Sequence, residues 1–322
     1  METRFTKLAK VEYPIICGAM YPCSNPELVA AVSDAGGLGI IQPISLTYVH
    51  EYDLRKGIEK IRSLTKKPVG FNVIVEKNAK VYEDRMKAWV DIAVEMGVRF
   101  FITALGNPTW VIERVKPKGG VVFHDVTERK WADKVVRLGI DGLICVNNRA
   151  GGHAGSLDPQ GLYDQLKPLG LPLICAGGIG NEKDFQRALA IGYDGVQMGT
   201  RFIATLECNS HKDYKDAIIA AAEGDIVKTE RVTGVPLSVI RTPYVDRVGL
   251  KVGPLARWLF RHRKTRHWIR LFYNVRAIVA MKRSSLKGVS TKDYYQAGKS
   301  VEGIDRVEPV KAVIDRFVAG KS

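Results

Sequence analysis

The fold is decided by a stretch near the middle of the chain, residues 143–156, which read LICVNNRAGGHAGS. Its first four residues form a continuous apolar run, which is typical of a strand buried on both faces of a parallel sheet. The run ends in asparagines and glycines, and His153 follows two of the glycines. Glycines let a backbone approach a flat ligand closely, and a histidine can exchange a proton near neutral pH. A mobile surface loop is the alternative interpretation of this segment.

Seven further apolar runs of strand length alternate with amphipathic stretches of helix length. Strands are expected to begin near Tyr13, Leu38, Pro68, Arg99, Gly119, Asp141, Pro172 and Asp194. Helices are expected over residues 26–35, 52–64, 82–96, 108–115, 128–138, 160–169 and 182–191. Eight β/α units within about 200 residues predict a (β/α)8 TIM barrel. A doubly wound sheet is the competing architecture, but it rarely keeps so regular a repeat through eight strands.

Functional residues of such barrels lie in the loops after the carboxyl ends of the strands. Glycine-rich or polar clusters follow six of the expected strands here. In chain order they are Gly18-Ala19-Met20, Asn72, His124-Asp125, Gly151-Gly152-His153, Gly177-Gly178 and Gly199-Thr200.

The loops after the seventh and eighth expected strands predict a phosphate site. Both would present backbone N–H groups, and a helix is expected to begin near Asn181, where its amides and dipole favour an anion. Tight turns that need glycine are the alternative. Together with the polar Asn72, the pattern favours a planar cofactor that carries a phosphate. FMN fits better than NAD because neither glycine pair belongs to a GxGxxG that opens a helix.

Four motifs in order resemble those of the nitronate monooxygenase (2-nitropropane dioxygenase-like) family. Residues 14–20, PIICGAM, continued by 26–39, PELVAAVSDAGGLG, are similar to its N-terminal signature. AGGHAG at 150–155 resembles its histidine motif, and AGGI at 176–179 and QMGTRF at 197–202 resemble its FMN-phosphate loops. The resemblance covers about residues 10–205. The FMN-dependent enoyl-acyl carrier protein reductases belong to the same superfamily and share these motifs.

The resemblance implies a set of site residues. His153 would be catalytic, lying over the flavin beside the substrate, and no metal is expected. Two positions depart from the family pattern, with Cys17 where glutamine is frequent and Arg149 where an acidic residue is frequent. The residues implied to hold or line the FMN are Gly18, Ala19, Met20, Asn72, Gly151, Gly152, Gly177, Gly178, Gly199 and Thr200.

The activity that the resemblance implies is oxidation of alkyl nitronates, with dioxygen reoxidising the flavin. The alternative is an NAD(P)H-dependent enoyl-thioester reductase that docks a carrier protein. A third possibility, from a different class, is a flavin-free barrel that binds phosphate or an anionic surface. The small-molecule substrate would accordingly be a nitronate or an enoyl thioester.

The net charge of +15 is unevenly distributed along the 322 residues. Residues 251–287 contain eleven Lys and Arg and neither Asp nor Glu, so the remainder of the chain is only mildly basic. This aromatic-rich segment could meet an acidic protein or an anionic membrane surface, whereas nucleic acid is the least favoured partner. A positively charged cap with solvated arginines is the alternative. Its charged and aromatic residues include Arg257, Arg261, Lys264, Arg266, Trp258, Phe260, Trp268 and Phe272.

The domain organisation is expected to follow the barrel pattern. Residues 1–202 would form the FMN-binding barrel, 203–300 a basic cap over its mouth, and 301–322 a segment whose helix, at 307–317, returns to the barrel. The stretch 224–253 is expected to be a connection punctuated by proline and glycine.

Features of compartment and metal binding point to a reduced cytoplasmic protein. No apolar signal-peptide core is evident near the first residue, and no run approaches 18 apolar residues. The five cysteines form no CxxC pair and no metal-ligand spacing. Cys145 and Cys175 are expected to fill the core. His124 is expected either to contact a ligand or to be a structural histidine.

Overall fold

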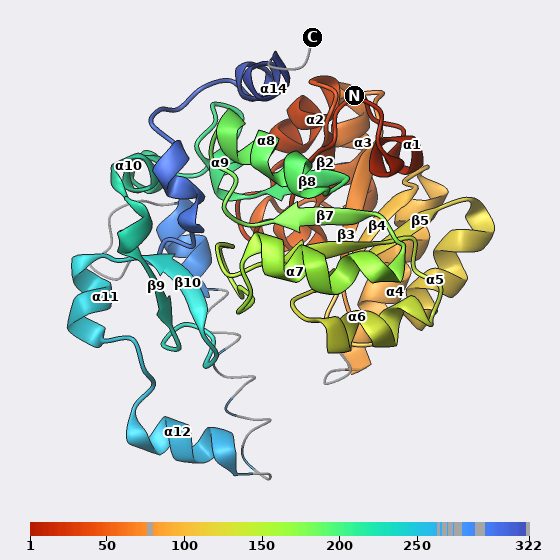
Figure 1. The fold of residues 1–322 in the computed structure, drawn as a ribbon. Coiled ribbons are helices and arrows are strands. Elements are labelled where there is room, and N and C mark those ends of the chain that lie inside the picture. Colours follow the sequence, from red (N-terminus) through yellow and green to blue (C-terminus); the bar gives the residue numbers. More distant parts are fainter. Residues whose placement is uncertain are drawn as a thin grey trace.

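The structure of the chain is a computed structural model, and it describes residues 1–75, 80–262, 265, 269, 273, 279–286 and 294–319. Eight parallel strands close into a barrel in chain order (Figure 1). This confirms the predicted TIM barrel. The strands are β1 Ile15–Cys17, β2 Leu38–Ile41, β3 Val69–Ile74, β4 Phe100–Ala104, β5 Val121–Val126, β6 Gly142–Val146, β7 Leu173–Ala176 and β8 Gly195–Met198.

Each predicted helix between the strands is present, with ends shifted by a few residues. They are α2 Pro26–Asp34, α3 Leu54–Leu64, α4 Lys80–Glu95, α5 Thr109–Val115, α6 Arg129–Val136, α7 Pro159–Leu166 and α8 Glu182–Ile191. Three short helical turns are also present in the described part of the barrel. One is a π-helical turn, η1 Ser45–Val49, and two are 3-10 turns that directly follow α5 and α7, η2 Lys116–Lys118 and η3 Lys167–Leu169.

An N-terminal helix that the sequence pattern did not predict, α1 Arg4–Ala9, closes the amino-terminal end of the barrel. Phe5 on this helix packs edge-on against Phe100 and Phe123 inside the barrel, with ring centroids 5.7 and 6.2 Å apart. Since this end is plugged by aromatic rings, ligands can enter the barrel only from the carboxyl ends of the strands.

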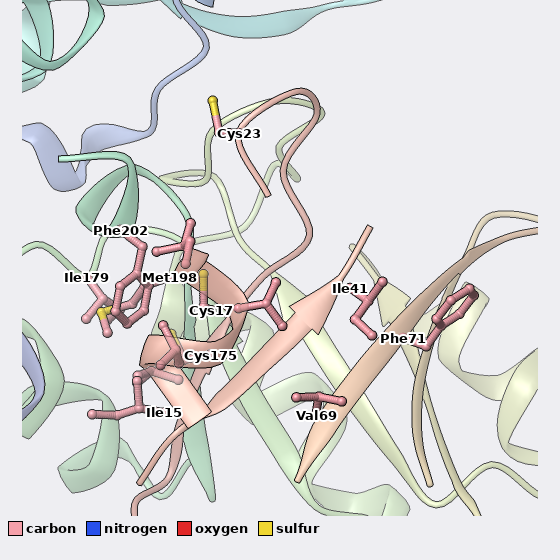
Figure 2. Packing of buried hydrophobic residues seen from close by; sticks show 14 of the residues in the cluster. Ile15, Cys17, Cys23, Ile41, Val69, Phe71, Cys175, Ile179, Met198 and Phe202 are labelled. Atoms are coloured by element: carbon pink, nitrogen blue, oxygen red, sulfur yellow. The ribbon is translucent and has the colours of Figure 1, made fainter. Parts of the chain in front are cut away.

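Alternation along the strands divides the buried side chains into an inner and an outer layer. Residues such as Ile16, Phe123 and Ile174 fill the interior, whereas their neighbours pack outward against the helices. Figure 2 shows part of the outer layer, including Cys17 and Cys175. Cys145 also lies in this layer and is fully buried. Cys145 and Cys175 are therefore core residues, as expected.

Beyond β8 the chain leaves the barrel and builds a small separate sheet (Figure 1). The connection expected over 224–253 contains two paired strands and a helix, which the sequence pattern did not predict. The elements are α9 Thr200–Ile203, α10 Lys212–Ala220, η4 Glu223–Asp225, β9 Ile226–Thr229, β10 Leu237–Ile240, α11 Pro243–Val248, α12 Pro254–Arg261, η5 Lys299–Gly303 and α14 Val310–Val318.

The last helix, α14, lies against the barrel helices α2 and α8. Its Phe317 packs on Phe185 of α8 with ring centroids 5.9 Å apart. By contrast, α12 projects away from the barrel (Figure 1). On it Arg257 is exposed, and Trp258 has 55% of its surface exposed. Lys264, Arg266, His267, Trp268 and Phe272 of the basic stretch lie outside the described residues.

No helix in the described ranges is long and apolar enough to cross a membrane.

Candidate active site

The loops after β1 and β8 are joined at the mouth of the barrel. The Gly18 backbone N–H donates to the carbonyl of Met198, at 3.0 Å. A Cβ on Gly199 would lie 3.4 Å from the Met20 sulfur, so the Met20 side chain rests on that glycine. The structure therefore brings together two of the clusters that the sequence singled out, Gly18 to Met20 and Gly199 to Thr200.

The loops after β6 and β7 are packed backbone against backbone. Gly177 has φ of 118°, and a Cβ there would lie 2.5 Å from the Ala150 nitrogen. Gly178 has φ of 80°, and a Cβ there would lie 2.6 Å from Arg149 Nε. Other residues would be strained in this conformation and would also clash. These glycines are thus required to seat the histidine loop, in addition to any role toward a ligand.

Asn147 organises this pair of loops, and sequence reasoning missed it. The residue is fully buried. Its Nδ2 donates to the Gly177 carbonyl at 3.0 Å, and its Oδ1 accepts from the Arg149 N–H at 2.8 Å. An asparagine at the end of an apolar run looks like an ordinary strand terminator. Only the position of the loop after β7 shows that the Asn147 side-chain amide links this loop to the loop after β6.

Only some of the backbone N–H groups that were predicted to bind a phosphate are free to donate to a ligand. Helix α8 satisfies its own N-terminus through a capping box, in which Asn181 accepts from the Asp184 N–H at 3.0 Å. Asp184 Oδ2 in turn accepts from the Gly180 N–H, also at 3.0 Å. The capping box therefore occupies some of the N–H groups at this helix end, and the expectation that the helix end faces an anion stays a prediction. Among the described residues, the N–H groups of Gly177, Gly178 and Gly199 donate to no protein acceptor, so these remain for a ligand.

The segment around η5 lies directly over these loops. The Gly298 N–H donates to Thr200 Oγ1 at 3.0 Å, which leaves the Thr200 hydroxyl proton for another acceptor. A Cβ on Gly151 would lie 2.9 Å from the Gly298 nitrogen. A Cβ on Gly180 would lie 2.1 Å from the Ser300 carbonyl oxygen. The contacts bury one side of the loops and restrict how a ligand can approach them.

His153 is held between the barrel and the small sheet. The Gly152 carbonyl accepts from the Ser238 N–H of β10 at 2.8 Å, and Gly152 itself has φ of 69°. His153 Nε2 lies 3.3 Å from Thr233 Oγ1, and that hydroxyl donates to the Val235 carbonyl at 3.0 Å. Since the hydroxyl proton is used in this way, Nε2 is the donor and Nδ1 is left as an acceptor.

The environment of His153 favours its neutral form. The residue is exposed at the surface, and partial desolvation by the surrounding protein atoms lowers the pKa of the imidazole below its ordinary value. A neutral ring can accept a proton at Nδ1 and donate one from Nε2 near pH 7, which is what general acid–base work requires.

Arg149, the departure from the family pattern, forms an ion pair with the segment beyond the barrel. Its Nη1 and Nη2 lie 3.0 and 2.6 Å from the two carboxylate oxygens of Glu223. Lys299 Nζ lies 3.0 Å from the same carboxylate. The hydrogen bond from Arg149 is the main cause that lowers the pKa of Glu223. Arg149 thus ties the histidine loop to η4 and η5.

Three polar side chains line the interior of the barrel toward its mouth: Asn72, Asp125 and Gln197. Asn72 is opposite Ile102 in the strand register, and Gln197 is opposite Ile16, so both face inward. Asp125 shares the inner face of β5 with Phe123. The prediction that Asn72 and Asp125 follow their strands is wrong by a few residues, since both lie within them.

One oxygen of each of these three side chains is buried without a hydrogen-bond partner among the described residues. Buried polar atoms are normally satisfied, so the three oxygens indicate a ligand with polar groups along an edge. A flavin fits, because its ring system has carbonyl and N–H groups on one edge and its phosphate could take the free amides of the glycine loops. The residues present are therefore consistent with the implied cofactor.

His124, by contrast, is a structural residue. Its side chain is buried on the outer face of β5, and its Nδ1 lies 2.7 Å from Thr103 Oγ1. Burial lowers the pKa of His124 to about 4, so the ring is neutral at physiological pH. Of the two alternatives left by the sequence, the contact with a ligand is wrong.

No group of three or more potential metal ligands gathers anywhere in the described part of the chain.

A family model described as nitronate monooxygenase matches residues 2–320. Among curated proteins, (3aS,4S,5R,7aS)-5-hydroxy-7a-methyl-1-oxo-octahydro-1H-indene-4-carboxyl-CoA dehydrogenase of Mycobacterium tuberculosis is 33% identical over 261 residues, which cover 80% of this chain and 70% of that protein. A "probable nitronate monooxygenase" of Staphylococcus saprophyticus is 30% identical over 295 residues, covering 77% and 81% of the two chains.

A solved structure of high similarity is that of FabK from Thermotoga maritima. Its TM-score is 0.81 at 30% sequence identity, and the match covers 99% of this chain and 96% of that chain. The similarity therefore includes the segment beyond the barrel, which the sequence motifs cover least.

Proposed function

The chain belongs to the nitronate monooxygenase family and is a flavin-dependent oxidoreductase, and we propose that it binds FMN and oxidises alkyl nitronates with dioxygen. The observation that carries the proposal is the position of His153, on a loop that packs directly on the glycine loop with free amides. Proton transfer and anion binding are thereby combined at one end of the barrel.

The FMN phosphate would be held by the amides of Gly177, Gly178 and Gly199 and by the Thr200 hydroxyl. Gly18, Ala19 and Met20 would approach the ring with their backbone, and Asn72 would hydrogen-bond its polar edge. Gly151 and Gly152 would line the approach below His153. When bound, FMN supplies the acceptor for the electrons of the substrate, and the residues named here bind and orient it.

The proposed role of His153 is to hydrogen-bond the substrate and to transfer a proton to or from it. Its Nε2–H, now at the long distance of 3.3 Å from Thr233, can turn to a nitro oxygen of a nitronate. The neutral ring is suited to this role, because it can donate a hydrogen bond from Nε2 while Nδ1 remains able to accept a proton. The small sheet that holds Gly152 limits the movement of the loop and keeps the ring in place.

An absorbance spectrum tests the cofactor, and substrate kinetics test the reaction. Purified protein reconstituted with FMN should show flavin bands after removal of free FMN. It should then consume dioxygen with propionate 3-nitronate in the absence of NADH or NADPH. A protein that retains no flavin after reconstitution would contradict the cofactor assignment, and one that retains flavin but leaves nitronate unchanged would contradict the substrate.

A second candidate function is an NAD(P)H-dependent enoyl-thioester reductase. It is favoured by the mycobacterial relative, a carboxyl-CoA dehydrogenase that acts on a CoA thioester, and by the exposed Arg257 on the projecting α12. In this function His153 would polarise the thioester or enone, and the basic segment 251–287 would dock an acidic carrier protein. Rapid reduction of the bound flavin by NADH without any reduction by nitronate would select this candidate.

A further inference from the structure

Asp125 is an unusual residue for the interior wall of a barrel. The inner faces of the strands next to β5 are apolar, with Ile102 on β4 and Ile144 on β6. Asp125 Oδ1 is buried and has no hydrogen-bond partner in the described ranges. Asp125 as a whole is only partly buried, but a buried carboxylate oxygen without a partner is costly, so an aspartate at this position requires an explanation that the proposed function has not used.

The surroundings of Asp125 favour a carboxylic acid over a carboxylate. Burial alone raises the pKa of Asp125 to about 7, since no charged side chain contributes among the described residues. Two titratable residues close to Asp125 in the sheet register, His124 and Cys145, have side chains on the outer layer and carry no charge at neutral pH. His124 has its pKa lowered to about 4, and the Cys145 thiol has its pKa raised by burial. The pKa of His153, on the next loop, is also lowered.

Asp125 lies on the same inner wall of the barrel as two side-chain amides that also have an unsatisfied oxygen. Asn72 and Gln197 project from β3 and β8 into the same interior, each with an unsatisfied oxygen. Asn72 is also nine-tenths buried. A planar ring lying across the mouth would meet all three side chains, and a protonated carboxyl is the only one of the three that can donate an O–H.

We propose that Asp125 is a further ligand-contacting residue of the flavin site, which holds a proton and donates it in a hydrogen bond to a carbonyl oxygen of the bound ring. The proposal rests on the proposed function, since it needs a flavin in the barrel mouth. It adds a requirement that the function alone does not make. Flavin binding must take up a proton at any pH at which Asp125 of the free protein is ionised.

The test is the affinity of the flavin-free protein for FMN between pH 7 and pH 9. A phosphate monoester has its second pKa near 6, so the FMN phosphate does not titrate in this interval; riboflavin, which has no phosphate, serves as a second probe. For the wild-type protein we expect the Kd of both probes to rise with pH, by up to about tenfold per pH unit above the pKa of Asp125.

The variant Asp125→Asn should bind both probes with a Kd that hardly changes over the same interval. The control Asp164→Asn removes an exposed carboxylate on α7 and should keep the wild-type profile. Cys208, whose pKa is lowered to about 7, lies beside Cys23 and Ser210 and is unchanged in both variants. A pH-dependent Kd that persists in Asp125→Asn would therefore overturn the proposal.

A measurement on the wild-type protein alone covers the case in which the variant does not fold. Calorimetric titration with FMN at pH 8, in two buffers of different ionisation enthalpy, reports the protons taken up on binding. Uptake approaching one proton per FMN is expected, and binding without uptake would overturn the proposal. Failure of the wild-type protein to bind either flavin would instead contradict the proposed function, so the two failures are distinguishable.

Discussion

Arg149 and Glu223 form a two-armed ion pair, with nitrogen–oxygen distances of 3.0 and 2.6 Å, between the histidine loop and the segment beyond the barrel. The side chains are about two-thirds buried, at 31% and 34% exposure. Such a pair stabilises a protein by about 1 kcal/mol or less. Its larger effect should be geometric, because the same loop carries His153.

The variant Glu223→Gln tests this relationship. It should lower the melting temperature by only a few degrees, since about 1 kcal/mol corresponds to roughly 2–4 °C in a chain of this kind. The turnover number should fall by about tenfold, because a misplaced catalytic group is costly. Asp246→Asn, which breaks an exposed pair with Arg241, is the control and should change neither quantity appreciably. Equal activity in both variants would exclude a positioning role for Glu223.

The variant His153→Ala should retain its flavin and lose about two to four powers of ten in turnover, the range for removal of a general acid–base. Flavin absorbance after gel filtration and steady-state kinetics measure the two effects. Thr233→Ala, which removes only the hydrogen-bond partner of the ring, should reduce turnover several-fold. A His153→Ala enzyme of full activity would refute the assigned role.

The variant Gly177→Ala should weaken FMN binding by tenfold or more. The added Cβ would clash with the Ala150 nitrogen at 2.5 Å and displace the loop whose amides we assign to the phosphate. Gly170→Ala is the matched control, because Gly170 also has positive φ, 73°, but open space around it. It should lose about 1 kcal/mol of stability through backbone strain and keep its affinity for FMN. Equal loss of affinity in both variants would show that strain alone is responsible.

Asp125 should also impose a pH dependence on the stability of the flavin-free protein. Its folded-state pKa, raised to about 7, lies above the ordinary value of 3.8. Between these values the folded state holds a proton that the unfolded state has lost, so stability declines as pH rises and levels off above about 7. Urea unfolding of Asp125→Asn should lack this decline, with a difference of a few kcal/mol as an upper bound. Parallel profiles for both proteins would mean that Asp125 ionises normally in the fold.

Much of the barrel could be predicted from the sequence, because strands buried on both faces are continuous apolar runs. For β3 and β5, the same rule predicted strand ends that lie a few residues before the observed ones. Asn72 and Asp125 face the interior at the mouth and are compatible with a strand, and His124 is satisfied by Thr103 on the outer face. A polar residue within such a run therefore does not end the strand, which continues through it.

The small sheet beyond the barrel was not predicted because its information is not local. Strand β9 contains Lys228 and Thr229 and is only four residues long, so it has neither an apolar run nor a clear alternation. It exists because β10 pairs with it, and β10 is fixed in turn by Gly152 and Gln296. The roles of Asn147 and Arg149 were hidden for the same reason, since their partners lie 30 and 74 residues away.

The central claim, that this flavin enzyme takes electrons from a nitronate, is tested most directly by anaerobic stopped-flow mixing. FMN-loaded protein is mixed with propionate 3-nitronate or with NADH, and the visible absorbance of the flavin is followed. We expect rapid bleaching by the nitronate, recovery of absorbance when dioxygen is admitted, and little or no bleaching by NADH. Rapid bleaching by NADH with an unchanged spectrum in nitronate would contradict the claim.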